Sequence, residues 1–439
     1  MRVNKTKQIL NQLRNYESRN VTFTESDGSW PIVWERARGA NVWDAEDKKY
    51  LDLTAAFGVA AAGHANPRVV KAGQKQMNKL LHAMGDVHPH ALKAQLAREL
   101  SRLTFERWTR KKSKGATGKT IFCNSGFEAV EAALKTALLA TSKPGVISFE
   151  KGYHGLGYGA LNATHRDHFR WPFRAQLSDF GHFVEFPSAS KRLPEVETAI
   201  RQLMKRREIG AILVEPIQAR GGINVPPPKF LPLLRRLCNE HGALLILDEI
   251  YTGFGRTGRW FACEHSETIP DLICLGKAMA GGFPISACVG RADIMDAAWP
   301  VSSGEAIHTS TFLGHPVGCA MALAQIEEIR KQKLVERSAQ LGNYLMKLLQ
   351  SNISNPQFEI SIRGAGLMVG LELCLSGGIP ATIVSLRVIK EMLHRGFILL
   401  PEGAHGNVIS FTPPLTITKS QLAATVNALQ NLLGYRKTS

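Results

Sequence analysis

An acidic residue and a lysine each follow a short apolar run, and the pair could bind and activate a carbonyl cofactor. Asp248 closes the run 244–247, and Lys277 follows Leu272-Ile-Cys-Leu-Gly276 at the start of a glycine-rich turn. A lysine amine can form a Schiff base, and a carboxylate can face the nitrogen of a pyridine ring. Pyridoxal phosphate chemistry needs both groups. A lysine alone would be weak evidence, because most lysines are solvated surface groups.

A second motif, Asn124-Ser-Gly-Phe-Glu128, follows a predicted strand and opens a predicted helix over 128–139. Ser125 and Glu128 fit an S-x-x-E capping box, which by itself would explain both residues. Gly126 also lets a ligand approach the backbone closely, and the free N–H groups of a helix start favour a phosphate. The two interpretations are compatible.

Other residues that could do chemistry have structural explanations as well. Tyr153 follows the next predicted strand, where an aromatic ring either fills the core or stacks on a flat cofactor. The run His308-Thr-Ser-Thr-Phe312 precedes a predicted helix, so its hydroxyls either cap that helix or donate to a phosphate. Arg256 lies in a turn between Gly253 and Gly258 and receives no role.

These residues depend on an α/β fold to bring them together. The apolar runs 120–123, 145–149, 211–214 and 244–247 are typical of strands covered on both faces. A helical pattern over 228–241, ended by Gly242, connects the last two runs into a βαβ unit and so predicts a largely parallel sheet.

Segments at both ends of the chain have a different character. Residues 1–62 read as a helix followed by short strands at 31–34, 40–43 and 50–53. A long helix at 317–331 comes before strands at 366–372 and 407–411, mixed with further helices. We therefore predict a large domain over 63–325 and a smaller α+β domain built from 1–62 and 326–439.

Composition narrows the class of protein. The net charge is +17 (54 basic minus 37 acidic residues), but the densest basic run is Arg110-Lys-Lys-Ser-Lys114, without the aromatic residues of a nucleic-acid site. Seven cysteines form no CxxC pair, which argues against a metal site and indicates reduced thiols in a cytoplasmic protein. No apolar run reaches membrane-spanning length, and the N-terminus lacks a secretory signal pattern.

The motifs together resemble one family, the class III (ω-amino-acid) pyridoxal phosphate-dependent aminotransferases of fold type I. The resemblance rests on Val214-Glu-Pro-Ile-Gln218, the run from Asp248-Glu-Ile-Tyr-Thr-Gly-Phe-Gly-Arg-Thr-Gly258, and Pro270-Asp-Leu-Ile through Gly276-Lys277 to Gly281-Gly-Phe-Pro284. Supporting matches extend from Trp43-Asp44 to Pro413-Pro-Leu415. The resemblance therefore covers nearly the whole chain.

This resemblance implies catalytic roles for two residues. Lys277 would carry the cofactor as a Schiff base and, once displaced by substrate, move the proton between substrate and cofactor. Asp248 would keep the pyridine nitrogen protonated. The implied reaction takes an amino group from a primary amine or amino acid to a 2-oxo acid in a ping-pong cycle.

The resemblance also implies the binding residues of pyridoxal phosphate. Ser125, Gly126 and Phe127 would hold the phosphate, the last two through backbone N–H groups, and Tyr153 would stack on the ring. Thr311, with Ser310 beside it, matches a position that reaches the phosphate of a partner subunit. A homodimer with shared active sites is therefore expected.

Three positions depart from the family pattern. Glutamate-using members carry an acid where this chain has Arg220, and an arginine where it has Ser410. The usual Glu/Arg switch is absent, and we expect Arg220 to bind a substrate carboxylate, since a guanidinium matches a carboxylate in two-point contact; a structural ion pair is the alternative. Tyr251 stands where many members place a glutamine that contacts the cofactor's 3-oxygen.

Two other interpretations stay open at this point. The same scaffold hosts aminomutases and decarboxylases, which keep the lysine, the aspartate and the phosphate site. A non-catalytic or nucleic-acid-associated protein is supported only by the charge of +17. The sequence does not identify the amine, nor does it choose between pyruvate and 2-oxoglutarate.

Overall fold

A seven-stranded sheet forms the centre of the computed structural model, which describes residues 4–25, 29–110 and 115–434. All pairings in the sheet are parallel except those of β10, which is antiparallel to both of its neighbours. In sheet order the strands are β4 (Gly118–Cys123), β10 (Ser286–Arg291), β9 (Leu272–Leu275), β8 (Leu244–Asp248), β7 (Ile209–Val214), β5 (Gly145–Phe149) and β6 (Gly181–Val184). The predicted mostly parallel sheet is confirmed.

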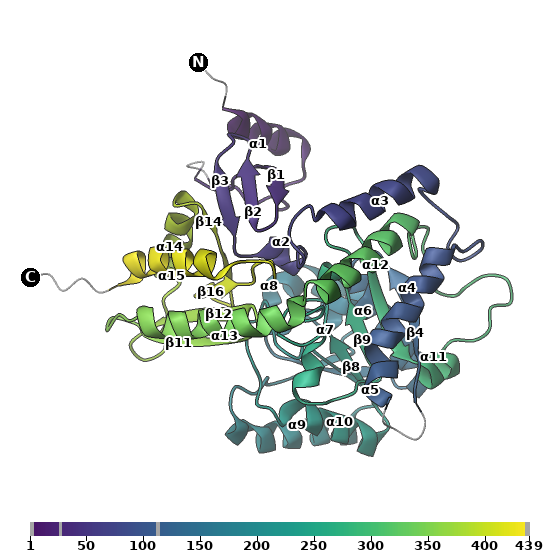
Figure 1. Ribbon diagram of the computed structural model, residues 1–439. Helices are drawn as coiled ribbons and strands as arrows, with labels where there is room; N and C mark the ends of the chain where they lie inside the picture. The colour runs from purple at the N-terminus through teal and green to yellow at the C-terminus, as the bar shows by residue number, and fades with distance from the viewer. Residues whose placement is uncertain (1–3, 26–28, 111–114, 435–439) are drawn as a thin grey trace, which may run out of the picture.

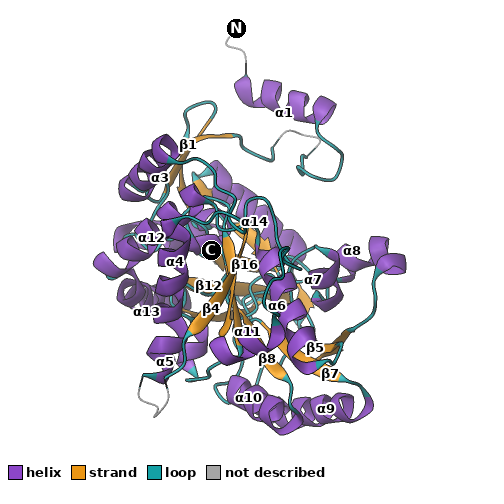
Figure 2. Cartoon of the chain, turned by 90° about the vertical axis from the view of Figure 1, so that its right-hand side faces the viewer, coloured by secondary structure: helices purple, strands orange, loops and turns teal. Residues whose placement is uncertain are grey.

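Helices cover both faces of this sheet, as Figure 2 shows. Successive residues of a strand point to opposite faces, so Leu245 and Leu247 of β8 join one core cluster while Ile246 joins the other. Alanines of α6 (Gly126–Thr141) fill the second cluster, whereas α9 (Leu193–Arg206) and α10 (Phe230–His241) contribute to the first. Burial on both sides explains why these strands are apolar throughout.

Two smaller sheets lie beside the large one. One contains β1 (Trp34–Arg38), β2 (Asn41–Asp44), β3 (Lys49–Asp52) and β14 (Phe397–Ile398); the other contains β11 (Glu359–Ala365), β12 (Met368–Leu375), β16 (Val408–Phe411) and β15 (Leu400–Glu402), with β13 (Ile379–Pro380) paired to β12. Parallel pairing of β14 with β3 joins the N-terminal and C-terminal segments, which lie on the same side of the large sheet, whereas the marked chain ends are far apart (Figure 1). The domain limits 62/63 and 325/326 stay predictions.

The remaining helices connect these sheets. They are α1 (Lys5–Tyr16), α2 (Ala55–Gly58), α3 (Pro67–Lys79), α4 (Ala91–Ser101), the π-helix η1 (Arg102–Glu106), α5 (Arg107–Thr109), α7 (Tyr158–Ala163), α8 (Asp167–Arg170), α11 (Ala292–Ala298), α12 (Pro316–Lys331), α13 (Leu334–Asn352), α14 (Thr382–His394) and α15 (Lys419–Leu433). Short 3₁₀ turns are η2 (Trp171–Gln176), η3 (Ser190–Arg192), η4 (Ala262–His265) and η5 (Lys277–Met279).

Strands β6 and β10 of the large sheet were not predicted from the sequence, and one predicted strand is misplaced. The predicted strand at 31–34 is wrong, because β1 begins only at Trp34; Pro31 has no backbone N–H to donate to a sheet. Gly242 ends α10 in the left-handed conformation (φ 62°), as predicted. Of the basic run at 110–114, residues 111–114 lie outside the described residues. Within the described part of the chain, no helix combines the length and apolarity needed to cross a membrane.

Candidate active site

A cavity of about 530 Å³ opens at the carboxyl ends of the parallel strands. In open α/β sheets this edge is where ligands bind, because side chains from several loops converge there. The lining residues are Phe57, Gly126, Phe127, Tyr153, His154, Gly155, Leu156, Glu215, Ala219, Arg220, Asp248, Ile250, Tyr251, Lys277 and Glu402. Six predicted site residues are therefore brought together: Lys277, Asp248, Gly126, Phe127, Tyr153 and Arg220.

Asp248 is the last residue of β8 and is 5% exposed. Its Oδ1 accepts a hydrogen bond from the backbone N–H of Ile250 at 3.1 Å, and its Oδ2 lies 2.8 Å from Nδ1 of His154. His154 is itself buried, and its backbone N–H donates to Thr164 at 2.9 Å. The carboxylate is thus held at a fixed angle in the cavity, with His154 as its side-chain donor.

Lys277 begins the short turn η5 after β9, with a φ of 37° in the left-handed region. Its Nζ lies 4.7 Å from the centre of the Tyr251 ring. Burial lowers the pKa of Lys277, and this effect is opposed by the negative charges of Asp248 and Glu215. A lower pKa leaves more of the amine unprotonated, which is the form that attacks a carbonyl carbon.

The segment Ser125-Gly-Phe fits a phosphate group. Ser125 caps α6, and the Glu128 carboxylate accepts from the backbone N–H groups of Ser125 and Asn124 at 2.8 and 2.7 Å. The buried Ser125 hydroxyl donates to no described group, so it is available to a ligand. A Cβ on Gly126 would lie 3.1 Å from Ile250, so a larger residue would crowd this cradle. The predicted capping box is present, and it leaves the Ser125 hydroxyl free for an anion.

Glu215 closes one side of the site. Its two oxygens accept hydrogen bonds from the backbone N–H groups of Tyr153 at 2.9 Å and Ala219 at 3.0 Å. Burial raises the pKa of Glu215 to about 7. These bonds fix the loops after β5 and β7 relative to each other, and thereby position Tyr153 and Arg220.

Arg220 faces the cavity beside aromatic rings. Its guanidinium carbon lies 5.2 Å from the centre of the Tyr153 ring and 5.9 Å from that of Phe169. Its Nε is buried without a hydrogen-bond partner, and no described carboxylate lies within ion-pairing distance of it. The structural ion pair considered as an alternative is therefore not formed among the described residues.

Glu402, at the end of β15, lines the same cavity and is 6% exposed. Burial raises the pKa of Glu402 to about 7, and the nearby positive charges of Arg220 and Arg166 oppose the shift. The site thus contains a guanidinium and a carboxyl group that titrates close to neutrality.

Tyr251 presents its ring rather than its hydroxyl to Lys277. The hydroxyl lies 3.2 Å from the Thr412 hydroxyl, which in turn donates to the backbone oxygen of Thr54 at 3.2 Å. Gly58 leaves room for the ring, since a Cβ there would lie 3.1 Å from it. Tyr251 therefore contributes an aromatic wall.

Thr311 is exposed and is not among the cavity-lining residues. Its neighbour Ser310 accepts a hydrogen bond from Asn124 at 3.4 Å, so the segment lies near the phosphate cradle of its own chain. The N-cap of the following helix α12 is His315, which excludes the capping role considered for the hydroxyls of 309–311. A contact of Thr311 with a partner subunit stays a prediction.

Sequence reasoning missed three residues of this site: His154, Glu215 and Glu402. Two of them carried a usable signal, because His154 adjoins Tyr153 and Glu215 begins the Glu-Pro-Ile-Gln motif. Glu402 had no such signal in the sequence, because it reaches the cavity from β15, far along the chain from the other site residues.

Comparison with known proteins agrees with this geometry. The family model described as Aminotransferase class-III matches residues 22–433. The acetylornithine aminotransferase of Methanosarcina acetivorans is 37% identical over 92% of both chains, and the putrescine aminotransferase of Pectobacterium atrosepticum is 36% identical over 92% of this chain and 83% of its own. The solved ornithine aminotransferase of Toxoplasma gondii superposes with a TM-score of 0.83 at 27% identity, over 98% of this chain and 96% of the other.

Proposed function

The chain belongs to the class III aminotransferases, pyridoxal phosphate enzymes of fold type I, and we propose that Arg220 selects its substrates by their carboxylate. Its aminotransferase relatives favour transamination over the aminomutase and decarboxylase alternatives. When bound, pyridoxal phosphate supplies an electron-accepting ring that stabilises negative charge on the substrate carbon.

The proposed roles at the reacting centre follow from position and charge. Lys277 would hold the cofactor through its Nζ, and the same amine could carry a proton to and from the substrate carbon. Asp248 would keep a proton on the pyridine nitrogen, and His154 fixes the carboxylate by its 2.8 Å contact. Tyr153 would cover the ring, and the N-terminus of α6 with the Ser125 hydroxyl would receive the phosphate.

The guanidinium of Arg220, whose buried Nε has no hydrogen-bond partner among the described residues, is the observation that carries the substrate proposal. A half-buried arginine without an ion-pairing carboxylate in the described part of the chain leaves a cation to be neutralised, and a substrate carboxylate fits it in two-point contact. The relatives' names include a donor with a carboxylate, acetylornithine, and one without, putrescine. A 2-oxo acid always carries one, so we assign Arg220 chiefly to the acceptor.

We also propose a homodimer. Exposed apolar side chains gather on two segments, with Leu81 and Met84 on one and Ile307 and Phe312 on the other. The segments lie side by side, since the rings of His82 and Phe312 are 5.3 Å apart. A second copy would cover this surface and bring its Thr311 near the phosphate site. A cytoplasmic location is consistent with cysteines that are all free.

The test separates the acceptor step from the donor step. Enzyme stripped of cofactor is loaded with pyridoxamine phosphate and titrated with pyruvate or 2-oxoglutarate, while the visible band of the lysine-bound cofactor is followed. We expect Arg220→Met to raise the half-saturating 2-oxo acid concentration about 10- to 100-fold, since hydrogen bonds to charged groups contribute about 1.5–3 kcal/mol. The half-saturating concentration of Arg220→Lys should lie between those of the unaltered enzyme and Arg220→Met.

Two results would contradict the proposal in different ways. If neither 2-oxo acid restores the band in the unaltered enzyme, these acceptors are wrong. If the band returns but Arg220→Met leaves the half-saturating concentration unchanged, the carboxylate site lies elsewhere.

A further inference from the structure

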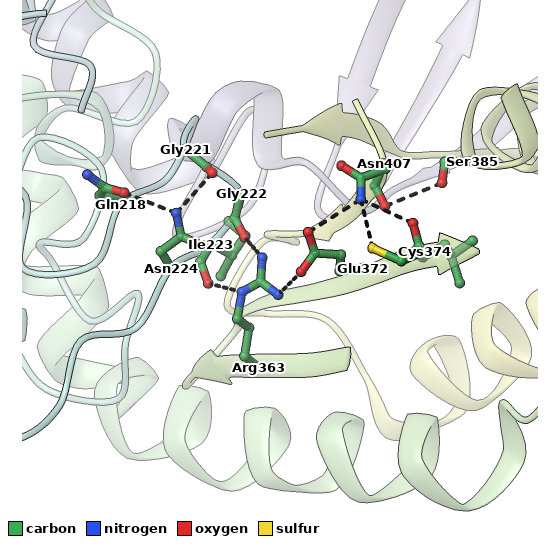
Figure 3. A network of polar contacts seen from close by, with 11 residues as sticks. Gln218, Gly221, Gly222, Ile223, Asn224, Arg363, Glu372, Cys374, Ser385 and Asn407 are labelled. Carbon is green, nitrogen blue, oxygen red and sulfur yellow. Dashed lines mark hydrogen bonds and ion pairs between the residues drawn. The ribbon is translucent and has the colours of Figure 1, made fainter. Parts of the chain in front are cut away.

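Arg363 of β11 binds the back of the loop that carries Arg220. Figure 3 shows its guanidinium between that loop and β12. Its Nη2 donates to the backbone oxygen of Gly222 at 2.6 Å, its Nε donates to that of Ile223 at 3.0 Å, and its Nη1 pairs with Glu372 at 2.6 Å. All three nitrogens of the group are thus occupied, two of them by the loop.

The two carbonyls that Arg363 binds belong to a strained turn. Gly222 has a φ of 112° and Ile223 a φ of 52°, both in the left-handed region. For a β-branched residue this conformation is a true outlier, with a cost on the order of 1–3 kcal/mol. A strained residue persists only when its surroundings hold it. One contact of Arg363 falls on the strained Ile223 and the other on the glycine before it.

Other contacts also hold this loop. The backbone N–H groups of Gly222 and Ile223 donate to the Ala219 oxygen at 3.1 Å, and Ile223 is 1% exposed in a small core cluster with Met368. Gln218 and Asn224 close its base by mutual backbone hydrogen bonds of 3.1 and 3.0 Å, and the Arg220 oxygen accepts from Gly403 at 3.1 Å. Open space lies on both sides: the catalytic cavity is lined by Arg220, and a second cavity of about 520 Å³ is lined by Gly221 and Asn224. The loop is therefore packed at Ile223, whereas its Arg220 side borders open space.

Arg363 is in turn anchored in the C-terminal sheet. Glu372 accepts from the amide of Asn407 at 3.3 Å, and the same amide donates to the backbone oxygen of Leu373 at 3.1 Å (Figure 3). Asn407 is 3% exposed, so this end of the network is rigid. The network runs from the core of the small sheet to the active-site loop.

We propose that Arg363 is a positioning residue for acceptor specificity: it holds the turn at Gly222 and Ile223 so that Arg220 meets the substrate carboxylate. This inference rests on the proposed role of Arg220. A planar guanidinium can serve two carbonyls and one carboxylate at once, whereas a lysine ammonium lacks that fork. Arg363 touches neither substrate nor cofactor.

The test compares Arg363→Met and Arg363→Lys with Arg337→Met. Arg337 is a matched control, because its guanidinium also donates to backbone oxygens, including that of Leu415 at 3.0 Å, but outside this loop. Each protein is loaded with pyridoxamine phosphate and titrated with the 2-oxo acid. Cofactor affinity, melting temperature and amide hydrogen exchange of residues 218–225 are also measured.

We expect Arg363→Met to raise the half-saturating 2-oxo acid concentration at least about tenfold, since misplacing a binding group by about 1 Å can cost 100-fold. Arg363→Lys should show a smaller rise. Pyridoxamine phosphate affinity should stay within about twofold, because the phosphate site lies on other elements, and exchange of 218–225 should accelerate. Arg337→Met should lower the melting temperature but leave both the half-saturating 2-oxo acid concentration and the exchange of residues 218–225 unchanged.

The inference is overturned if the amide hydrogens of residues 218–225 exchange no faster in Arg363→Met than in the unaltered enzyme. It is also overturned if Arg363→Met and Arg337→Met lose the same melting temperature and have the same half-saturating 2-oxo acid concentration. If Arg220→Met also leaves the acceptor constant unchanged, both the role of Arg220 and this inference fail. If Arg220→Met raises the half-saturating 2-oxo acid concentration but the Arg363 variants match the Arg337 control, the role of Arg220 stands and this inference alone fails.

Discussion

Replacing His154 with phenylalanine tests how the carboxylate of Asp248 is held. The substitution keeps an aromatic ring of similar size in the buried position but removes the donor 2.8 Å from Oδ2. Oδ1 keeps its bond to Ile250, so one of the two oxygens loses its partner. Asp248 is 5% exposed, and water offers little compensation.

The expected magnitude follows from that lost bond. A buried acceptor left unpaired costs about 1–3 kcal/mol, which corresponds to about a 5- to 150-fold effect. Because we propose that Asp248 acts on the ring nitrogen, the loss should appear in pyridoxal phosphate affinity and in the single-turnover rate with an amine. His154→Asn, which restores a shorter donor, should recover part of both.

The assay is a titration of cofactor-free enzyme with pyridoxal phosphate, followed by a stopped-flow measurement of the visible band with amine. His165→Phe is the matched control, because that histidine packs against Phe183 at 5.0 Å and does not line the cavity. If His154→Phe stays within about twofold of the unaltered enzyme in both quantities, the contact with Asp248 has no catalytic consequence and the reasoning is wrong.

Four further predictions follow from the site and its surroundings. Burial raises the pKa of Glu402 to about 7, so its carboxyl group is neutral below that pH and repels an incoming carboxylate above it. The half-saturating 2-oxo acid concentration should therefore rise between about pH 6 and 8. Glu402→Gln should remove this dependence on pH. A folded-state pKa above the ordinary value also means that this group's contribution to stability is present at low pH and lost as the pH rises through 7, so Glu402→Gln should gain stability relative to the unaltered enzyme at pH 8. Mixed dimers of Lys277→Ala and Thr311→Ala protomers should regain one site of normal cofactor affinity if Thr311 serves the partner, and none if it serves its own chain. Arg256 is 1% exposed and donates to the backbone oxygens of Leu367 and Pro413 at 2.9 and 2.5 Å. Arg256→Ala should therefore lower the free energy of unfolding by about 3 kcal/mol, as measured by urea denaturation.

Local sequence patterns were enough to predict part of the site and five strands of the large sheet, all but β6 and β10. Continuous apolar runs marked strands covered on both faces, and in a parallel sheet the carboxyl ends of such strands share one edge. Asp248 and Lys277 stand directly after two of these runs, and Gly126 opens a helix after a third. Each is positioned by its own strand, so no long-range contact had to be known.

The sequence alone therefore determined the family, the cofactor and which strand ends meet at the cavity. Only the tertiary structure decided what surrounds Arg220: Glu402 enters from the last part of the chain, and Arg363 binds the loop across 141 residues to Gly222. Such contacts depend on how the C-terminal sheet packs beside the large one, and no local periodicity records that packing. The left-handed turn at Ile223 gave no signal either, because its conformation is imposed by its neighbours rather than by its residue type.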